Sequence, residues 1–204
     1  MNRFLGACAM ATALLHRAPA QVIEFEQSGL KYQTLTKSGV TVMFAIMPSH
    51  LHEYAIMQVA VSNGAHGPYI IRPEDFTYYR TDGAGIRASA ARDVILMLEQ
   101  HGNGSDAIKL VTTYENAIAG NAHLKSTNGY EQRRQAALAM GSVRLKAAAA
   151  ASALAMVQTK LAAGESTDGA VFFPTEGKPL GPGKLIVRTN TDVFEFNPSG
   201  APGM

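Results

Sequence analysis

Residues 39–63 contain two long runs in which apolar and other side chains alternate. The apolar residues that share one face are Val40, Val42, Phe44 and Ile46 in 39–47, and Ala55, Met57, Val59 and Val61 in 53–63. A period of two is typical of a β-strand with one buried face. Asn63-Gly64 supplies turn chemistry at the end of the second run. The segment therefore predicts two strands of a sheet that must be covered on its apolar side.

Strand character returns in shorter runs at both ends of the chain. These runs are 68–72, 75–81, 170–173, 184–188 and 193–196. Between them the pattern predicts helices over about 90–101, 106–119 and 130–163, with Ser89 and Ser105 as N-caps and a polar loop at 120–129. Strands at both ends with helices between them predict an α+β chain. We expect a single β-domain over 21–204, interrupted by a three-helix insertion at about 87–163.

The predicted helix 130–163 carries an apolar heptad pattern. Its members are Ala136, Met140, Val143, Ala147, Ala150, Leu154, Val157 and Leu161. We expect this face to pack on the other helices and on the sheet; the alternative is that part of it projects and binds a second copy or another envelope protein. The uncharged stretch 147–157 is too short for a membrane span, which takes about 20 residues.

The N-terminus has the features of an export signal. Arg3 precedes an apolar run over 4–15, and Ala18-Pro19-Ala20 matches a small-x-small cleavage pattern. We predict a signal peptide over 1–20 and a mature protein in the periplasm or outside the cell. Leu5-Gly6-Ala7-Cys8 also resembles a lipobox, but seven residues before Cys8 leave no room for a normal export signal, so lipoprotein anchoring is the minor alternative.

Cleavage changes the charge of the chain. The whole chain has 18 basic and 16 acidic residues, and removal of Arg3 and Arg17 leaves 16 of each. A neutral mature chain gives no electrostatic reason to expect nucleic acid or an anionic membrane as a partner. Cys8, the single cysteine, is removed as well. The fold must then be held by its apolar core in an oxidising compartment.

Motifs for catalysis are missing from the sequence. It has no G-x-S-x-G element, and the mature part has no thiol nucleophile. The segment 177–185 (GKPLGPGKL) has the wrong spacing for a phosphate-binding loop, and we interpret it as a turn. Glu74-Asp75 follows Pro73 and is interpreted as a turn into a strand rather than a catalytic pair. We predict no catalytic, cofactor-binding or metal-binding residues.

His50 and His52 are the one pair with metal-ligand spacing, because side chains two apart in an extended segment share a face. Met47 and Met57 would suit copper(I), and His66 lies further along the chain. Against this, Pro48-Ser49 indicates a short loop, and Met57 falls on the apolar side of its strand. We interpret 48–52 as a loop, with copper or zinc binding as the alternative.

Two stretches resemble exported bacterial immunoglobulin-like domains of unknown function. They are 59–83 (VAVSNGAHGPYIIRPEDFTYYRTDG) and 162–174 (AAGESTDGAVFFP). The resemblance implies an antiparallel sandwich of about seven strands, which equals the number of strands predicted here. It implies no catalytic residues, and the long helical insertion is a departure from it.

We therefore expect an exported, non-enzymatic interaction module of the cell envelope. Its partner would be another envelope protein or a second copy, bound through 130–163, including Arg133, Arg134, Arg144 and Lys160, or through the 120–129 loop. The alternatives are a periplasmic copper or zinc protein that uses His50 and His52, and a hydrolase whose active site the sequence does not reveal.

Overall fold

The computed structural model describes residues 21–119 and 130–197, and within them the chain is a mixed α+β fold with antiparallel sheets, which confirms the predicted class. The predicted signal peptide over 1–20 and the 120–129 loop lie outside the described residues. The strands are β1 (Ile23–Gln27), β2 (Leu30–Lys37), β3 (Val40–Leu51), β4 (Tyr54–Asn63), β5 (Tyr69–Ile71), β6 (Phe76–Arg80), β7 (Gly85–Arg87), β8 (Thr159–Leu161), β9 (Ser166–Pro174), β10 (Gly183–Arg188) and β11 (Val193–Phe196). The helices are α1 (Ala91–His101), α2 (Gly104–Ala119), α3 (Tyr130–Leu138) and α4 (Val143–Leu154).

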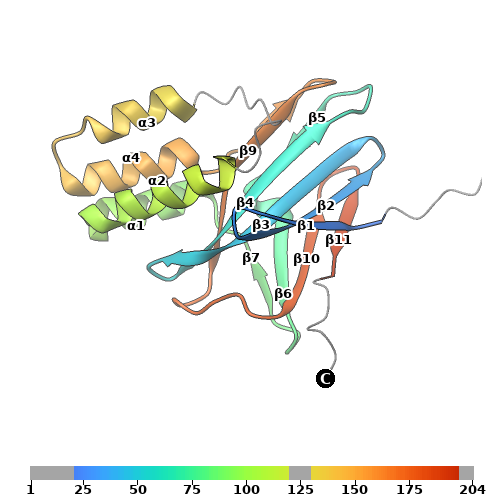
Figure 1. Ribbon diagram of the computed structural model, residues 1–204, viewed down its shortest axis with the longest axis horizontal. Coiled ribbons are helices and arrows are strands. Elements are labelled where there is room, and N and C mark those ends of the chain that lie inside the picture. Colours follow the sequence, from blue (N-terminus) through green and yellow to red (C-terminus); the bar gives the residue numbers. More distant parts are fainter. Residues whose placement is uncertain (1–20, 120–129, 198–204) are drawn as a thin grey trace, which may run out of the picture.

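A five-stranded sheet with the order β1-β2-β3-β4-β9 lies at the centre of the molecule (Figure 1). The two strands predicted from 39–63 are β3 and β4, which pair antiparallel along most of their length. Alternate residues of β9 show that this sheet is buried on both faces. Phe173 packs into one apolar core, and its neighbour Phe172 packs into another.

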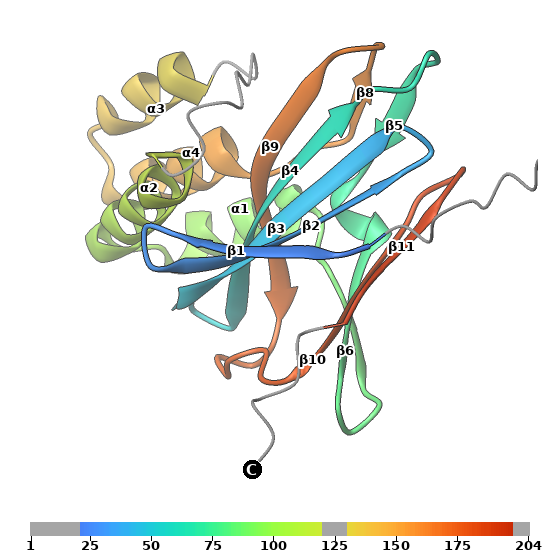
Figure 2. The same ribbon diagram turned by 45° about the vertical axis from the view of Figure 1, so that its right-hand side comes forward.

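The first core lies between the central sheet and a four-stranded sheet with the order β11-β10-β6-β7 (Figure 2). Phe44 of β3 meets Phe196 of β11 edge to face, with ring centroids 5.0 Å apart. A two-stranded sheet, β5-β8, adds Tyr69, Ile71 and Leu161 to the same core. Apolar side chains from three sheets therefore hold this half of the molecule together.

The second core lies between the other face of the central sheet and the helical layer, which we define as α1 to α4 (Figure 1). α4 packs against each of the other three helices. Its inward positions are almost all alanine, and Ala147, Ala150 and Ala151 are no more than 1% exposed. Small side chains let helices approach closely, so α4 forms the inner element of the layer.

Both ends of the helical layer are attached to the free edge of β9. Before α1, the Ser89 N–H donates to Phe172 O at 2.8 Å; after α4, the Met156 N–H donates to Ala170 O at 2.8 Å. Gly169 allows the second of these contacts, between Met156 and β9, because a Cβ at position 169 would lie 2.7 Å from Met156 N.

Substitution of Gly169 by alanine should therefore destabilise the protein by about 1–3 kcal/mol, the usual range for an overpacked interior. The added methyl group meets the backbone at Met156 N and at Leu154 O, and neither can rotate away. Urea unfolding would measure the loss. Gly67→Ala is the control, since a Cβ there has no atom within 4 Å; equal stability of the two variants would contradict the close approach.

The prediction of one long helix over 130–163 is wrong. The segment forms α3, a break at residues 139–142, α4, a connector and then β8. The backbone turns at Gly141-Ser142, and α3 folds back on α4 instead of continuing it. Met140, Val143 and Val157 of the proposed heptad face are 40%, 52% and 49% exposed, so they form no continuous seam. The described residues hold four helices over 91–154 rather than three over 87–163.

Four strands were not predicted, namely β1, β2, β7 and β8. Every residue of β1 is exposed, although Ile23 and Phe25 alternate with Glu24 and Glu26. The capping residues also differ from those predicted. Ala90 precedes α1, and at the start of α2 the Oδ1 of Asn103, not Ser105, accepts the N–H groups of Ser105 and Asp106.

Candidate functional site

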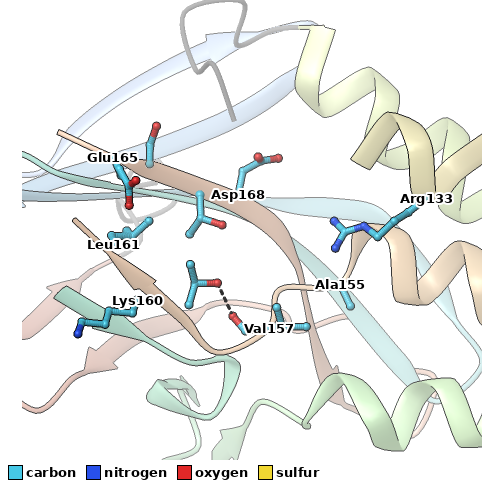
Figure 3. Close-up of a pocket in the computed structure, with 10 residues that line it drawn as sticks. Arg133, Ala155, Val157, Lys160, Leu161, Glu165 and Asp168 are labelled. Atoms are coloured by element: carbon cyan, nitrogen blue, oxygen red, sulfur yellow. Dashed lines mark hydrogen bonds between the residues drawn. The ribbon is translucent and has the colours of Figure 1, made fainter. Parts of the chain in front are cut away.

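A pocket of about 200 Å³ opens where the start of β9 meets the connector that follows α4 (Figure 3). It is lined by Arg133, Ala155, Val157, Thr159, Lys160, Leu161, Glu165, Ser166, Thr167 and Asp168. The connector and β8 form one wall because residues 159–161 pair with β5, and α3 brings Arg133 to the opposite side. The pocket thus depends on the attachment of the helical layer to β9.

Asp168 is the most buried charged residue of the pocket, with 8% of its surface exposed. Its Oδ2 accepts hydrogen bonds from the Tyr114 hydroxyl of α2 and, at 3.4 Å, from Gln58 Nε2 of β4. Burial of a carboxylate requires such donors. Asp168 therefore joins the central sheet to the helical layer through hydrogen bonds made inside the fold.

The remaining charges of the pocket lie nearer to solvent. Glu165 Oε2 accepts the Ala162 N–H at 2.7 Å, which shapes the turn before β9. Arg133 and Lys160 bring two positive charges to the rim (Figure 3). This arrangement can bind small polar groups. In the described parts of the chain, no three His, Cys, Asp or Glu side chains are grouped so that they could hold a metal ion.

His50 and His52 lie in different elements of the fold. His50 lies in β3, beyond an irregularity in the strand register that follows Ile46. Residues 48–51 therefore belong to the strand, and the loop is shorter than the predicted 48–52. His52 lies in the turn to β4 at a φ of 49°, and its Nε2 donates to Asp106 Oδ2 at 2.9 Å. This bond fastens the turn to the start of α2.

The two methionines considered as copper ligands point to opposite sides of the central sheet. Met47 packs into the core under the helices, and Met57 packs into the core between the sheets. The set Met47, His50, His52 and Met57 therefore does not converge on one point.

Glu74 and Asp75 form the turn that the sequence predicted. Pro73–Asp75 is a single 3-10 turn before β6, and the Arg72 N–H donates to Asp75 Oδ2 at 2.9 Å. Neither acid lines the pocket. The near-miss to a phosphate-binding loop is likewise a turn, with positive φ angles at Glu176, Gly177 and Gly181, and it leads into a strand.

Burial raises the pKa of the Asp75 carboxyl above its usual value, although the Arg72 N–H and the Arg72 charge act to lower it. Folding thus favours the protonated form. Its contribution to stability is present below the unfolded-state pKa, about 3.9, and is lost as the pH rises through the folded-state pKa. Asp75→Asn keeps an acceptor without a charge, so we expect this variant to gain stability relative to wild type between pH 3 and pH 7. Urea unfolding of both proteins at each pH tests this; a pH-independent difference would contradict it.

Of the four cations named from the sequence, two lie at the rim of the pocket and two do not. Arg134 Nε lies 2.5 Å from Glu115 Oε1 of α2 and holds α3 to its neighbour. Arg144 is exposed in the first turn of α4. Two members of the heptad pattern, Met140 and Val143, are exposed together with two residues outside it. Around the α3–α4 connection, four apolar residues are 40–52% exposed, namely Leu138, Met140, Val143 and Leu145.

No protein-family model matches this chain, and no curated protein does. Among solved structures, the yjhA protein from Bacillus subtilis is similar with a TM-score of 0.34 and 8% sequence identity, over 85% of this chain and 93% of that one. At that TM-score the likeness carries no argument about fold or function.

Proposed function

We propose that this protein is an exported, non-enzymatic interaction module whose contact surface is the helical tip, defined as residues 138–145. The observation that carries the proposal is the exposure of Leu138, Met140, Val143 and Leu145 within eight consecutive residues. Single exposed apolar residues are ordinary, but a group of them is typical of an interaction site. Residues 138–145 are all exposed, so none of these side chains contributes to either core.

The pocket supports a ligand-binding function less well. It is small, and Asp168 and Glu165 already accept hydrogen bonds from the fold. Those contacts are the ones expected where a connector crosses the edge of a sheet. We assign the pocket a structural role and the helical tip the functional one.

We also propose that the two facing sheets form an immunoglobulin-like sandwich, and the strand order supports this. An immunoglobulin domain places strands A, B and E in one sheet and G, F, C and C′ in the other. Here the strands can be given the same letters in chain order. The sheet β3-β4-β9 then reads A-B-E, and the sheet β11-β10-β6-β7 reads G-F-C-C′. In this naming, the helical layer comes between strands C′ (β7) and E (β9) along the chain. The hairpin β1-β2 is an addition beside strand A (β3).

Deletion of the helices is not a suitable test of this function. Their removal would expose Met47, Tyr54, Ile56 and Phe172, which form the sheet side of the second core. A chain with that surface open is expected to aggregate. Point substitutions at the helical tip change the proposed surface and keep the core intact.

The test compares three forms of residues 21–204 as baits in native cell-envelope extract. The tip variant carries Leu138→Ser, Val143→Ser and Leu145→Ser; the control carries Ile23→Ser and Val157→Ser, which change residues that are 61% and 49% exposed elsewhere. Circular dichroism first verifies that all three are folded. We expect wild type and control to capture the same partner and the tip variant to lose it. Capture that does not depend on the helical tip would refute the proposal.

A further inference from the structure

We infer that the partner of the helical tip is the surface of an anionic lipid bilayer, an inference that rests on the proposed function. The charge of the mature chain is balanced overall, but it is unevenly distributed along the sequence. No acidic residue occurs between Gln132 and Gly164, whereas that stretch holds Arg133, Arg134, Arg144, Lys146 and Lys160. A neutral chain can therefore present a locally basic surface.

The position of the helical tip fits contact with a flat surface. The α3–α4 connection lies at the end of the helical layer that is farthest from the sheets (Figure 1). Leu138 is the last residue of α3, Met140 lies in the connection, and Val143 and Leu145 lie in the first turn of α4, which packs against α3. A bilayer can approach this end without contacting the sheets.

The two charged residues within 138–146 are both basic. Arg144 is exposed and Lys146 is half-buried, and neither forms a salt bridge within the described residues. On the adjacent helix α2, Glu115 is paired with Arg134 and Asp106 is bonded to His52. The N-terminus of α4 lies at the tip as well and adds a partial positive charge.

Apolar side chains beside cations are the combination that binds the interface of an anionic membrane. The apolar groups enter the headgroup region, and the cations attract the lipid phosphates. Binding of this kind is peripheral. No helix in the described part of the chain is long and apolar enough to cross a membrane. The interaction should be reversible and weakened by salt, because such charges act over a Debye length of about 10 Å at 0.1 M.

The experiment is co-sedimentation of residues 21–204 with vesicles of phosphatidylcholine alone or with added phosphatidylglycerol. We expect binding only to the anionic vesicles, with release at high salt. Arg144→Gln with Lys146→Gln should weaken it about tenfold or more, since each cation near such a surface contributes substantially. Lys31→Gln with Arg188→Gln removes two exposed cations elsewhere and should leave binding unchanged.

The tip variant with three serines distinguishes this inference from the proposed function. Its failure to bind anionic vesicles, with wild type bound, supports the lipid surface. If wild type does not bind vesicles, but capture from envelope extract or dimer formation in sedimentation still requires the helical tip, the lipid inference is wrong and the proposed function stands. If vesicle binding survives the three substitutions, the inference is also wrong. If the three substitutions at the helical tip have no effect in any of these assays, both the lipid inference and the proposed function are wrong.

Discussion

Phe172→Ala should lower the free energy of unfolding by about 3–5 kcal/mol, the usual cost of truncating a buried aromatic residue. Phe172 is 1% exposed and meets Tyr54 edge to face under the helical layer, with ring centroids 6.4 Å apart. Its neighbour Phe173 is fully buried in the core between the sheets. Phe173→Ala should cost a similar amount. Urea unfolding followed by circular dichroism measures both.

The comparison of these two adjacent residues tests whether the central sheet is covered on both faces. If the helices did not pack on the sheet, Phe172 would be exposed and its truncation would cost little, while Phe173→Ala would remain costly. Ile23→Ala is the control, because Ile23 is 61% exposed on β1. A substitution at such a site normally changes stability by no more than about 0.5 kcal/mol.

Asn63→Ala should lower the free energy of unfolding by about 3 kcal/mol, because it removes the donor of several buried carbonyl groups. Asn63 is fully buried at the end of β4. Its Nδ2 contacts the carbonyl oxygens of Gly67, Leu161 and Ala162 at 2.8–3.1 Å, and its Oδ1 accepts the Ala65 N–H. One side chain therefore holds the loop after β4 to the turn between β8 and β9.

Asn63→Asp separates the role of the amide donor from that of the amide oxygen. The aspartate keeps an acceptor for the Ala65 N–H but turns a carboxylate toward three carbonyl oxygens. We expect it to be less stable than Asn63→Ala at neutral pH and to recover part of the loss in acid, where it is protonated. Asn103→Ala, which removes an exposed helix cap, should cost only about 1 kcal/mol. Equal losses for Asn63→Ala and Asn103→Ala would contradict the role assigned to Asn63.

The contacts of Asn63 also explain why the start of β9 lies where it does. The Asn63 N–H donates to Glu165 O, and the Gly164 N–H donates to Asn63 O. Glu165 is followed directly by the three β9 residues that line the pocket. The pocket and the attachment of the helical layer thus rest on a turn that is organised by one buried amide.

The sequence by itself determined the two long strands with a regular apolar repeat of two. β3 and β4 were predicted within a few residues because their alternation is local, and Asn63 was correctly placed at a turn. β1 and β2 were missed although Ile23 and Phe25 alternate with Glu24 and Glu26, and although Tyr32 and Leu35 of β2 are buried. A usable signal was present. Ser28-Gly29 and Ser38-Gly39 have positive φ angles, as two-residue hairpin turns require, and such pairs can be sought in a sequence.

Only the tertiary structure decided how the region 130–163 is divided. A run of helix-forming residues with an apolar repeat is compatible with one long helix, with two packed helices and with a helix followed by a strand. The choice depended on distant partners: α1 and α2 for the alanine face of α4, β5 for 159–161, and Ala170 for the Met156 N–H. The exposure of the helical tip follows from that choice. The local pattern does not predict it, because Met140 and Val143 would have been buried in a continuous seam.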